Sequence, residues 1–102
     1  MTPLIKSIDQ LLSQAKERQF ISVMETESLK IACQKFDGEH RFRHLNEDHD
    51  EVIYVMSGEL TVWTDQGEHH LKKGEMLKIP KGVEHGDLFG KKVEILIIDA
   101  KL

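Results

Sequence analysis

The chain has 102 residues and a formal net charge of −4 at pH 7, with 39% hydrophobic and 31% charged residues. This is an ordinary globular mixture, and we predict one domain spanning residues 1–102. The negative charge argues against nucleic acid as a partner, and no apolar run approaches the roughly 20 residues that would span a membrane. The first residues contain no signal-peptide core, and the single cysteine, Cys33, excludes an internal disulfide. We therefore expect a cytoplasmic protein in which Cys33 acts as a small buried hydrophobe.

One segment, SIDQLLSQAKERQ (residues 7–19), has the pattern of a helix. Apolar residues recur at helical spacing from Ile8 to Ala15. Ser7, with Gln10 three residues later, resembles a capping box. Because the apolar stripe is narrow, we expect this helix to lie on the outside of a larger body. The helix and the strand that follows should occupy about residues 7–25.

From Phe20 onward the apolar pattern has the short period of β-strands. Strands are predicted at FISVME, LKIACQKF, EVIYVMS, ELTVWTD, EHHLKK, EMLKIPK and VEILIIDA. Between them lie the turn signals FDGE, SGE, DQGE, KKGE, PKG and FGKK. This pattern predicts an all-β fold, an antiparallel sandwich or barrel. DQG should form a tight hairpin, and KKVEILIIDA, the most apolar strand, should be central.

Several metal-ligand side chains fall at the ends of these strands. On a strand, alternate side chains share a face, so Glu51 should face the same interior as Ile53 and Val55. If its segment is extended, His44 shares a face with Phe42 and Asn46. His85 shares one with Val83, and Asp87 is a further candidate for that face. An acid and two histidines meeting at a barrel mouth would suit Zn, Mn, Fe, Ni or Cu.

At these residues the sequence resembles the cupin family. The first cupin motif is a Gly, five residues, His-x-His, three or four residues, Glu, six residues and Gly, and residues 38–58 follow it with Asn46 in place of the second His. The second is a Gly, five residues, Pro-x-Gly, two residues, His, three residues and Asn, and residues 74–89 follow it with Phe89 in place of the Asn. Fifteen residues separate the motifs, as in small single-domain cupins, and the match covers about half of the chain. The resemblance implies an antiparallel jelly-roll β-barrel.

Carried over residue by residue, the resemblance implies a divalent metal ion held by His44, Glu51 and His85. Asn46 stands at the fourth ligand position, either as a weaker neutral ligand or as a hydrogen-bonding group of the pocket. A loop shift would let His49 replace the missing histidine, although a solvated loop is the simpler interpretation. The opposing interpretation of the whole set is a degenerate barrel that binds no metal.

The remaining polar and aromatic residues have simpler interpretations. For His40, a surface position at a hairpin edge is favoured over a place inside the barrel. His69 and His70 must point to opposite faces of one strand, so they cannot both line a pocket. The run Glu47, Asp48 and Asp50 is predicted to form a solvated turn, with Asp50 as a candidate for orienting a ligand histidine. Core packing is favoured for Phe42, Trp63 and Phe89.

Three functional hypotheses follow, and the third is a structural role, a dimer in which the barrel is only a scaffold. The first is a small cupin that binds a divalent transition metal and a small organic ligand inside the barrel, and whether it catalyses a reaction is left open. The second is a metal-free, non-enzymatic ligand-binding or sensing module that acts as a homodimer. The outward face bearing Val52, Tyr54 and Met56 would pair with a second copy in each case.

Overall fold

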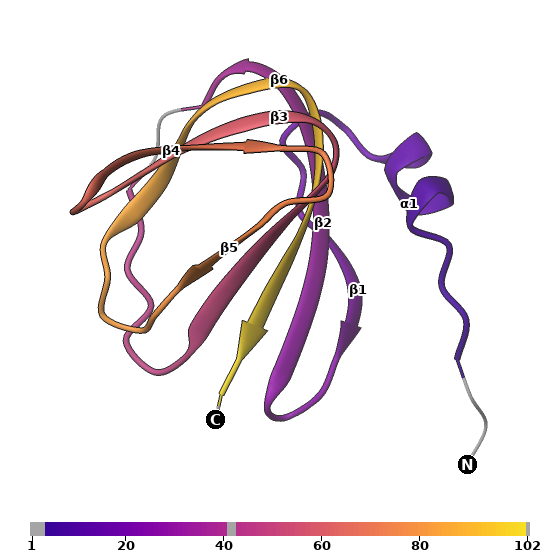
Figure 1. Cartoon of the computed structure of the whole chain (residues 1–102). Helices are drawn as coiled ribbons and strands as arrows, with labels where there is room; N and C mark the ends of the chain where they lie inside the picture. Colours follow the sequence, from indigo (N-terminus) through magenta and orange to yellow (C-terminus); the bar gives the residue numbers. More distant parts are fainter. Residues whose placement is uncertain (1–3, 41–42, 102) are drawn as a thin grey trace.

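The computed structural model describes residues 4–40 and 43–101, and Figure 1 shows a curled sheet with one short helix beside it. The elements are α1 (Ile8–Gln14), β1 (Ile21–Glu25), β2 (Leu29–Glu39), β3 (Asp50–Thr64), β4 (Gly67–Lys72), β5 (Met76–Ile79) and β6 (His85–Ala100). Every strand pair is antiparallel, the strand order is β1-β2-β6-β3-β4, and β5 pairs with β3. The all-β fold and the central place of the most apolar strand, now part of β6, are confirmed.

The strands number six among the described residues, one fewer than expected, because the predicted turn SGE lies inside β3 and joins two predicted strands. FDGE is within β2 and FGKK is within β6, so these two strands are longer than predicted. Gly38 and Gly58 do take the positive φ angles that a turn would use, 99° and 75°. They use them at irregularities of the strand register, where β2 and β3 continue through a bulge. The predicted DQG hairpin does form, since Thr64 pairs with Gly67 across a two-residue turn.

The bulge at Gly58 divides β3 between two partners. Before it, residues Glu51 to Tyr54 pair with β5, and after it, residues Glu59 to Thr64 pair with β4. The other edge of β3 pairs with β6 along almost the whole length of β3. The ladder therefore folds over, with β4 and β5 on its two halves, and encloses an interior (Figure 1). Nine fully buried apolar residues fill that interior, among them Val55, Leu60 and Ile95.

The helix is shorter than predicted. It ends at Gln14, and Ala15 already has extended backbone angles. The residues after Ala15 are polar, so a longer helix would have no apolar face to bury. The N-cap is as expected, because the Gln10 amide donates to the Ser7 hydroxyl at 3.2 Å. Leu12 packs against Val23 and Cys33 on the outside of the chain's own sheet, which also confirms Cys33 as a buried hydrophobe.

No helix in the described part of the chain is long and apolar enough to cross a membrane.

The position of Gly58 predicts that its substitution will unfold the sheet. A Cβ there would overlap the carbonyl oxygens of Lys91 and Lys92, while a Cβ at Gly38 has no atom near it. Both positions have positive φ, so both substitutions strain the backbone by about 1 kcal/mol or more. We expect Gly58→Ala to lower the free energy of unfolding by at least about 2 kcal/mol more than Gly38→Ala does. Urea unfolding followed by tryptophan fluorescence measures the free energy of unfolding of both variants. Equal losses of this free energy would show that the structure relieves the overlap at Gly58.

Candidate metal centre

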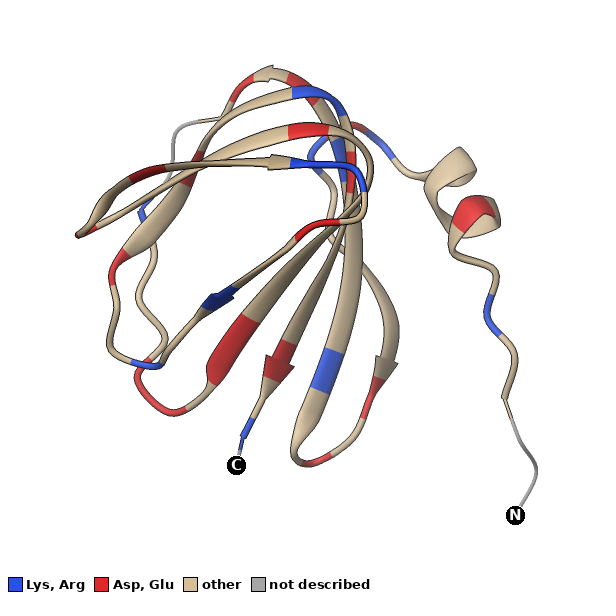
Figure 2. Ribbon diagram, in the orientation of Figure 1, with Lys and Arg blue, Asp and Glu red and all other residues tan. Residues whose placement is uncertain are grey.

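The interior of the barrel contains a cavity of about 390 Å³ that opens at the end of the sheet carrying Glu51. Its wall is mainly apolar, from Ala32, Ile53, Ile95 and Ile97. Polar side chains gather at the open end, and Phe20 lies beside them at the mouth. Figure 2 shows acidic positions on β3 and β6 and a basic one on β2 at this end of the sheet. The strand registers identify them, since Glu51 pairs with Asp99 and Asp99 pairs with Lys30.

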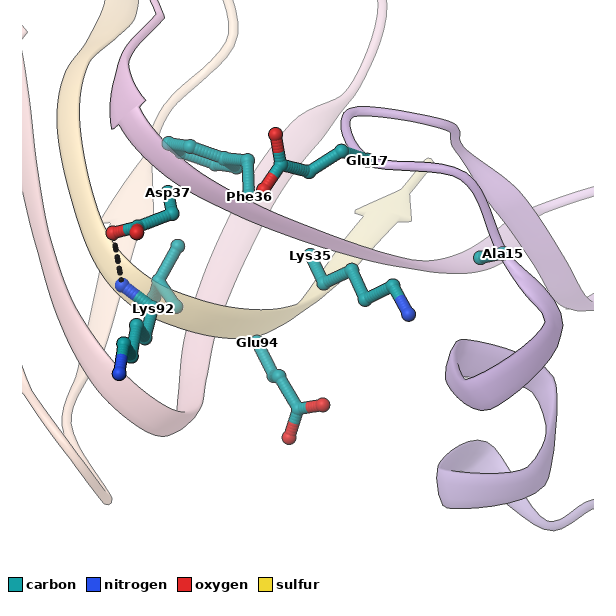
Figure 3. A pocket seen from close by; sticks show the side chains of 8 residues that line it. Ala15, Glu17, Lys35, Phe36, Asp37, Lys92 and Glu94 are labelled. Atoms are coloured by element: carbon teal, nitrogen blue, oxygen red, sulfur yellow. Dashed lines mark hydrogen bonds between the residues drawn. The ribbon is translucent and has the colours of Figure 1, made fainter.

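A larger hollow of about 520 Å³ lies on the outer surface, where the segment after α1 passes β2 and β6 (Figure 3). Lys35, Asp37, Lys92 and Glu94 line much of it, and the backbone amide of Lys92 donates to Asp37. It contains no histidine and no buried carboxylate. The smaller interior cavity is therefore the better candidate for chemistry.

Glu51 is the centre of the polar cluster. It is 8% exposed and begins the inward row of Ile53 and Val55, as alternation predicted. The Asn46 side-chain amide donates to Oε1 at 3.2 Å, and His85 Nε2 lies 3.2 Å from Oε2. Burial alone would raise the pKa of Glu51, but His85, Asn46 and Asp99 together hold that pKa below its ordinary value.

His85 faces this carboxylate with a nitrogen suited to a metal. It is 1% exposed, and its Nδ1 lies 3.0 Å from the carbonyl oxygen of Val83. A carbonyl oxygen only accepts hydrogen bonds, so Nδ1 carries a proton. In the neutral ring, Nε2 then carries the free lone pair. Among described residues Nε2 has no hydrogen-bond partner of good geometry, although Glu51 is close. A proton on Nε2, or a cation between the His85 ring and the Glu51 carboxylate, would give both groups a partner.

The protonation of His85 is itself favourable without a cation. Burial would lower the pKa of its imidazole, but the Glu51 carboxylate and the Val83 carbonyl raise it above its ordinary value. In the absence of metal, these opposed pKa shifts favour the charged forms of the two groups over the neutral forms.

His44 is brought to the same place by its backbone. Its amide donates to the His85 carbonyl at 2.8 Å, and the His85 amide donates back at 2.9 Å. The two rings stand edge to face, with centroids 5.6 Å apart and planes at 89°. His44 is exposed at the mouth and lines the cavity. The structure therefore places His44 beside His85, which itself faces Glu51.

Asn46 has a different place. It is 5% exposed, but it does not line the cavity, and its amide nitrogen is directed at Glu51. Its backbone carbonyl accepts from the Gly82 amide at 2.7 Å, which ties the first motif to the second. In this structure Asn46 orients Glu51, which agrees with the hydrogen-bonding alternative for this residue.

The donor types fit a divalent transition metal, since imidazole nitrogen and carboxylate oxygen are its usual ligands and His85 Nε2 is an orphaned buried atom. With side chains as they stand, no three His, Cys, Asp or Glu side chains among described residues converge closely enough to hold an ion. His85 and Glu51 already face each other, and a third ligand would have to rotate toward them for the three side chains to hold an ion.

Two interior residues were missed or undervalued from the sequence. His40 was expected on the surface, and this was wrong, because its side chain is only 20% exposed and packs edge-on against Phe36. Its Nδ1 lies 3.7 Å from Oδ2 of Asp87, which is 4% exposed and lines the cavity. The signal for Asp87 was alternation from His85. The signal for His40 was the same alternation, which starts at the inward residue Phe36 and reaches His40 just after the end of β2.

The other predicted positions have mixed outcomes. His49 contacts Asp48 and Asp99, and neither Glu51 nor His85. Asp50 orients no histidine, because its carboxylate accepts from the Lys81 amide at 2.9 Å. The prediction that Phe89 packs is wrong, since it is 45% exposed.

Three of the remaining residues lie on the sheet itself. His69 and His70 do point to opposite faces of β4, bonding Thr64 and Thr61 respectively. Trp63 is half-buried, with the Arg43 guanidinium 5.6 Å from its ring centroid. Phe42 lies outside the described residues.

Asp87 provides a test of the electrostatics of the cavity. Burial, followed by repulsion from Glu51, raises the pKa of Asp87 to about 7. Because this exceeds the roughly 3.9 of an unfolded Asp, the carboxyl group stabilises the fold at low pH, and this contribution is lost between about pH 4 and 7. We expect metal-free Asp87→Asn to be more stable than the parent at pH 8, by at most about 4 kcal/mol. Urea unfolding in EDTA at pH 8 and pH 5 measures this, and a gain that does not shrink at pH 5 would contradict it.

Comparison with known proteins agrees with this geometry. The chain matches the family model described as "Cupin domain" over residues 36–87. It is 35% identical over 82 residues to a protein named putative dioxygenase from Saccharolobus solfataricus, covering 79% of this chain and 21% of that one. It is 35% identical over 48 residues to quercetin 2,3-dioxygenase of Bacillus subtilis, covering 47% of this chain and 14% of that one. The chain thus spans about a fifth or less of these curated relatives.

Solved structures extend the likeness to the whole fold. A cupin-2 domain protein from Shewanella frigidimarina has a TM-score of 0.76 and 31% identity, covering 91% of this chain and 90% of that one. The protein TT1209 of Thermus thermophilus has a TM-score of 0.81 and 23% identity, covering 95% and 96%. The second likeness shows the fold alone, which is the antiparallel jelly-roll barrel. On the family match and the relative of known structure, this chain belongs to the cupin family.

Proposed function

We propose that this chain binds a divalent transition metal at the Glu51–His85 pair and a small organic ligand in the cavity beside it. The observation that carries the proposal is the buried Nε2 of His85, which faces the Glu51 carboxylate at 3.2 Å while Val83 occupies Nδ1. That tautomer leaves Nε2 available as a ligand atom. We assign His44 as the third ligand, since its ring stands next to that of His85 at the mouth; to reach the ion it would have to rotate inward from its exposed position.

The chain's own residues prepare this site. Val83 selects the tautomer of His85, and Asn46 holds one Glu51 oxygen so that the other faces the imidazole. The apolar wall excludes water from the inner part of the cavity and leaves room for an organic molecule. When bound, a metal with three protein ligands would supply Lewis acidity at its open positions.

The reaction class is a further part of the proposal. Both curated relatives are named dioxygenases, and this supports testing oxygen-dependent chemistry first. The support is limited to the shared barrel, because the chain covers only 21% and 14% of those proteins.

The competing candidate is a metal-free ligand-binding module, and one observation favours it. Glu51 and His85 satisfy each other as an ion pair when no cation is present, as their opposed pKa shifts indicate. In that case the cavity binds its ligand through hydrogen bonds alone, and the missing motif histidine reflects the loss of metal.

We further propose that the protein acts in the cytoplasm as a homodimer. The outward faces of β3 and β6 carry Val52, Tyr54, Leu96 and Ile98, all only half-buried in the single chain. Met56 and Leu96 on this face also pack against the cluster around α1. An apolar sheet face of this kind supports pairing with a second copy, and light scattering at micromolar concentration gives the mass that decides it.

The metal proposal predicts the behaviour of two histidine variants. Tag-free protein, stripped with EDTA and offered Mn, Fe, Ni, Cu or Zn, should retain one equivalent of at least one metal after desalting. We expect His44→Ala to weaken retention at least about tenfold. His70→Ala is the matched control, because His70 lies exposed on the outer face of β4 and contacts Thr61 and Glu59.

Elemental analysis of the desalted proteins gives the result. A parent protein that retains none of the five metals would reject the metal proposal and favour the metal-free module. Equal losses in the two variants would place the ion away from the cavity.

A further inference from the structure

Asp87 is the most deeply buried carboxylate that faces the cavity. It is the next residue after His85 on the inward face of β6, and it is 4% exposed. It lines the cavity together with His44 and Glu51. Neither cupin motif assigns a role to this position, and it lies between the motif histidine and Phe89.

Among the described residues, the Asp87 carboxylate has an ion-pair contact with His40 but no hydrogen bond. His40 Nδ1 lies 3.7 Å from Oδ2, which is too long for a hydrogen bond. Two other buried polar side chains of the barrel do have direct hydrogen bonds, although Gln34 Oε1 has none. Gln34 donates to the Arg18 carbonyl at 2.9 Å, and Asn46 donates to Glu51. A buried carboxylate without such bonds normally faces a cation.

Asp99, the other acid of the cavity, provides a contrast. It is directly opposite Glu51 in the β3–β6 register, and its side chain is 27% exposed. Lys30 is its neighbour on β2, and His49 Nε2 lies 3.6 Å from its Oδ1. Asp99 is thus more exposed than Asp87 and lies beside cationic side chains, although its Oδ1 has no hydrogen-bond partner among the described residues.

Asn46, at the motif's fourth ligand position, is the least suitable of these groups to bind an ion. It stands outside the cavity lining, and its amide nitrogen is already directed at Glu51. A fourth ligand must come from another strand, and Asp87 is the buried residue on the correct face.

We propose that Asp87 supplies the fourth ligand, so that the site consists of two imidazoles and two carboxylates. This inference rests on the metal binding proposed above. His40 then holds the rear oxygen of Asp87, in the way that outer partners orient ligating carboxylates. The added carboxylate makes the donor set harder than one with three histidines, so it should strengthen Mn²⁺ and Fe²⁺ binding more than Cu²⁺ binding.

The test compares Asp87→Asn with Asp99→Asn. Both substitutions replace a cavity carboxylate by an amide of the same shape, and EDTA-stripped samples are first checked by circular dichroism and urea unfolding. Mn²⁺ binding is then measured from the electron paramagnetic resonance signal of free Mn²⁺, and Cu²⁺ binding by competition with a chelator. We expect Asp87→Asn to weaken Mn²⁺ binding at least about tenfold and Cu²⁺ binding less, with a smaller loss of Mn²⁺ binding in Asp99→Asn than in Asp87→Asn.

The outcomes separate the two proposals. A parent protein that binds neither ion rejects the metal site altogether. A parent that binds Mn²⁺ while Asp87→Asn binds it equally well rejects only the role of Asp87. A larger loss in Asp99→Asn than in Asp87→Asn would transfer that role to Asp99. Equal weakening of Mn²⁺ and Cu²⁺ in Asp87→Asn would indicate a structural effect and would also overturn the proposal.

Discussion

The folding-over of the β3–β6 ladder is the constraint on which the site depends. In that ladder His85 pairs with Thr64, while Glu51 pairs with Asp99 at the opposite end. Along a flat sheet these two residues would stand far apart, since each strand residue adds about 3.3 Å. Their side chains nevertheless lie 3.2 Å apart, because the sheet closes on itself around the bulge at Gly58. The geometry of the site is therefore a consequence of barrel closure.

The polar cluster works against the stability of the barrel that holds it. Glu51 and His85 are buried charges that compensate each other, and Asn46 completes the hydrogen bonding of Glu51. Asp87 has no comparable compensation, and burial with repulsion from Glu51 keeps its pKa high. A bound cation would reverse this balance, since it attracts both carboxylates at once. A protein that places such a residue in its core accepts a weaker metal-free fold, as functional sites commonly do.

Alternation along strands predicted much of this arrangement, and turn signals predicted it less well. The shared face of Glu51, Ile53 and Val55 is confirmed, because a buried sheet face enforces a period of two. Gly38 and Gly58 were taken as turns because glycine at positive φ serves turns and bulges equally, and only the pairing partner separates them. His40 is misplaced for a related reason, since the turn predicted at FDGE hides the continuation of β2 to Glu39, directly before His40. The place of Asn46 behind Glu51 depends on tertiary contacts that no local pattern encodes.

The central claim is that a cation belongs between His85 and Glu51. Its most direct test is anomalous diffraction from crystals of the tag-free protein grown with Mn²⁺, measured where manganese scatters strongly. The account predicts one strong peak inside the barrel, adjoining His85 Nε2 and the Glu51 carboxylate, with Asp87 turned toward it. A barrel that shows no such peak, with manganese only at surface groups such as His49 or His70, would contradict the claim and leave the imidazolium–carboxylate pair as the natural state of the site.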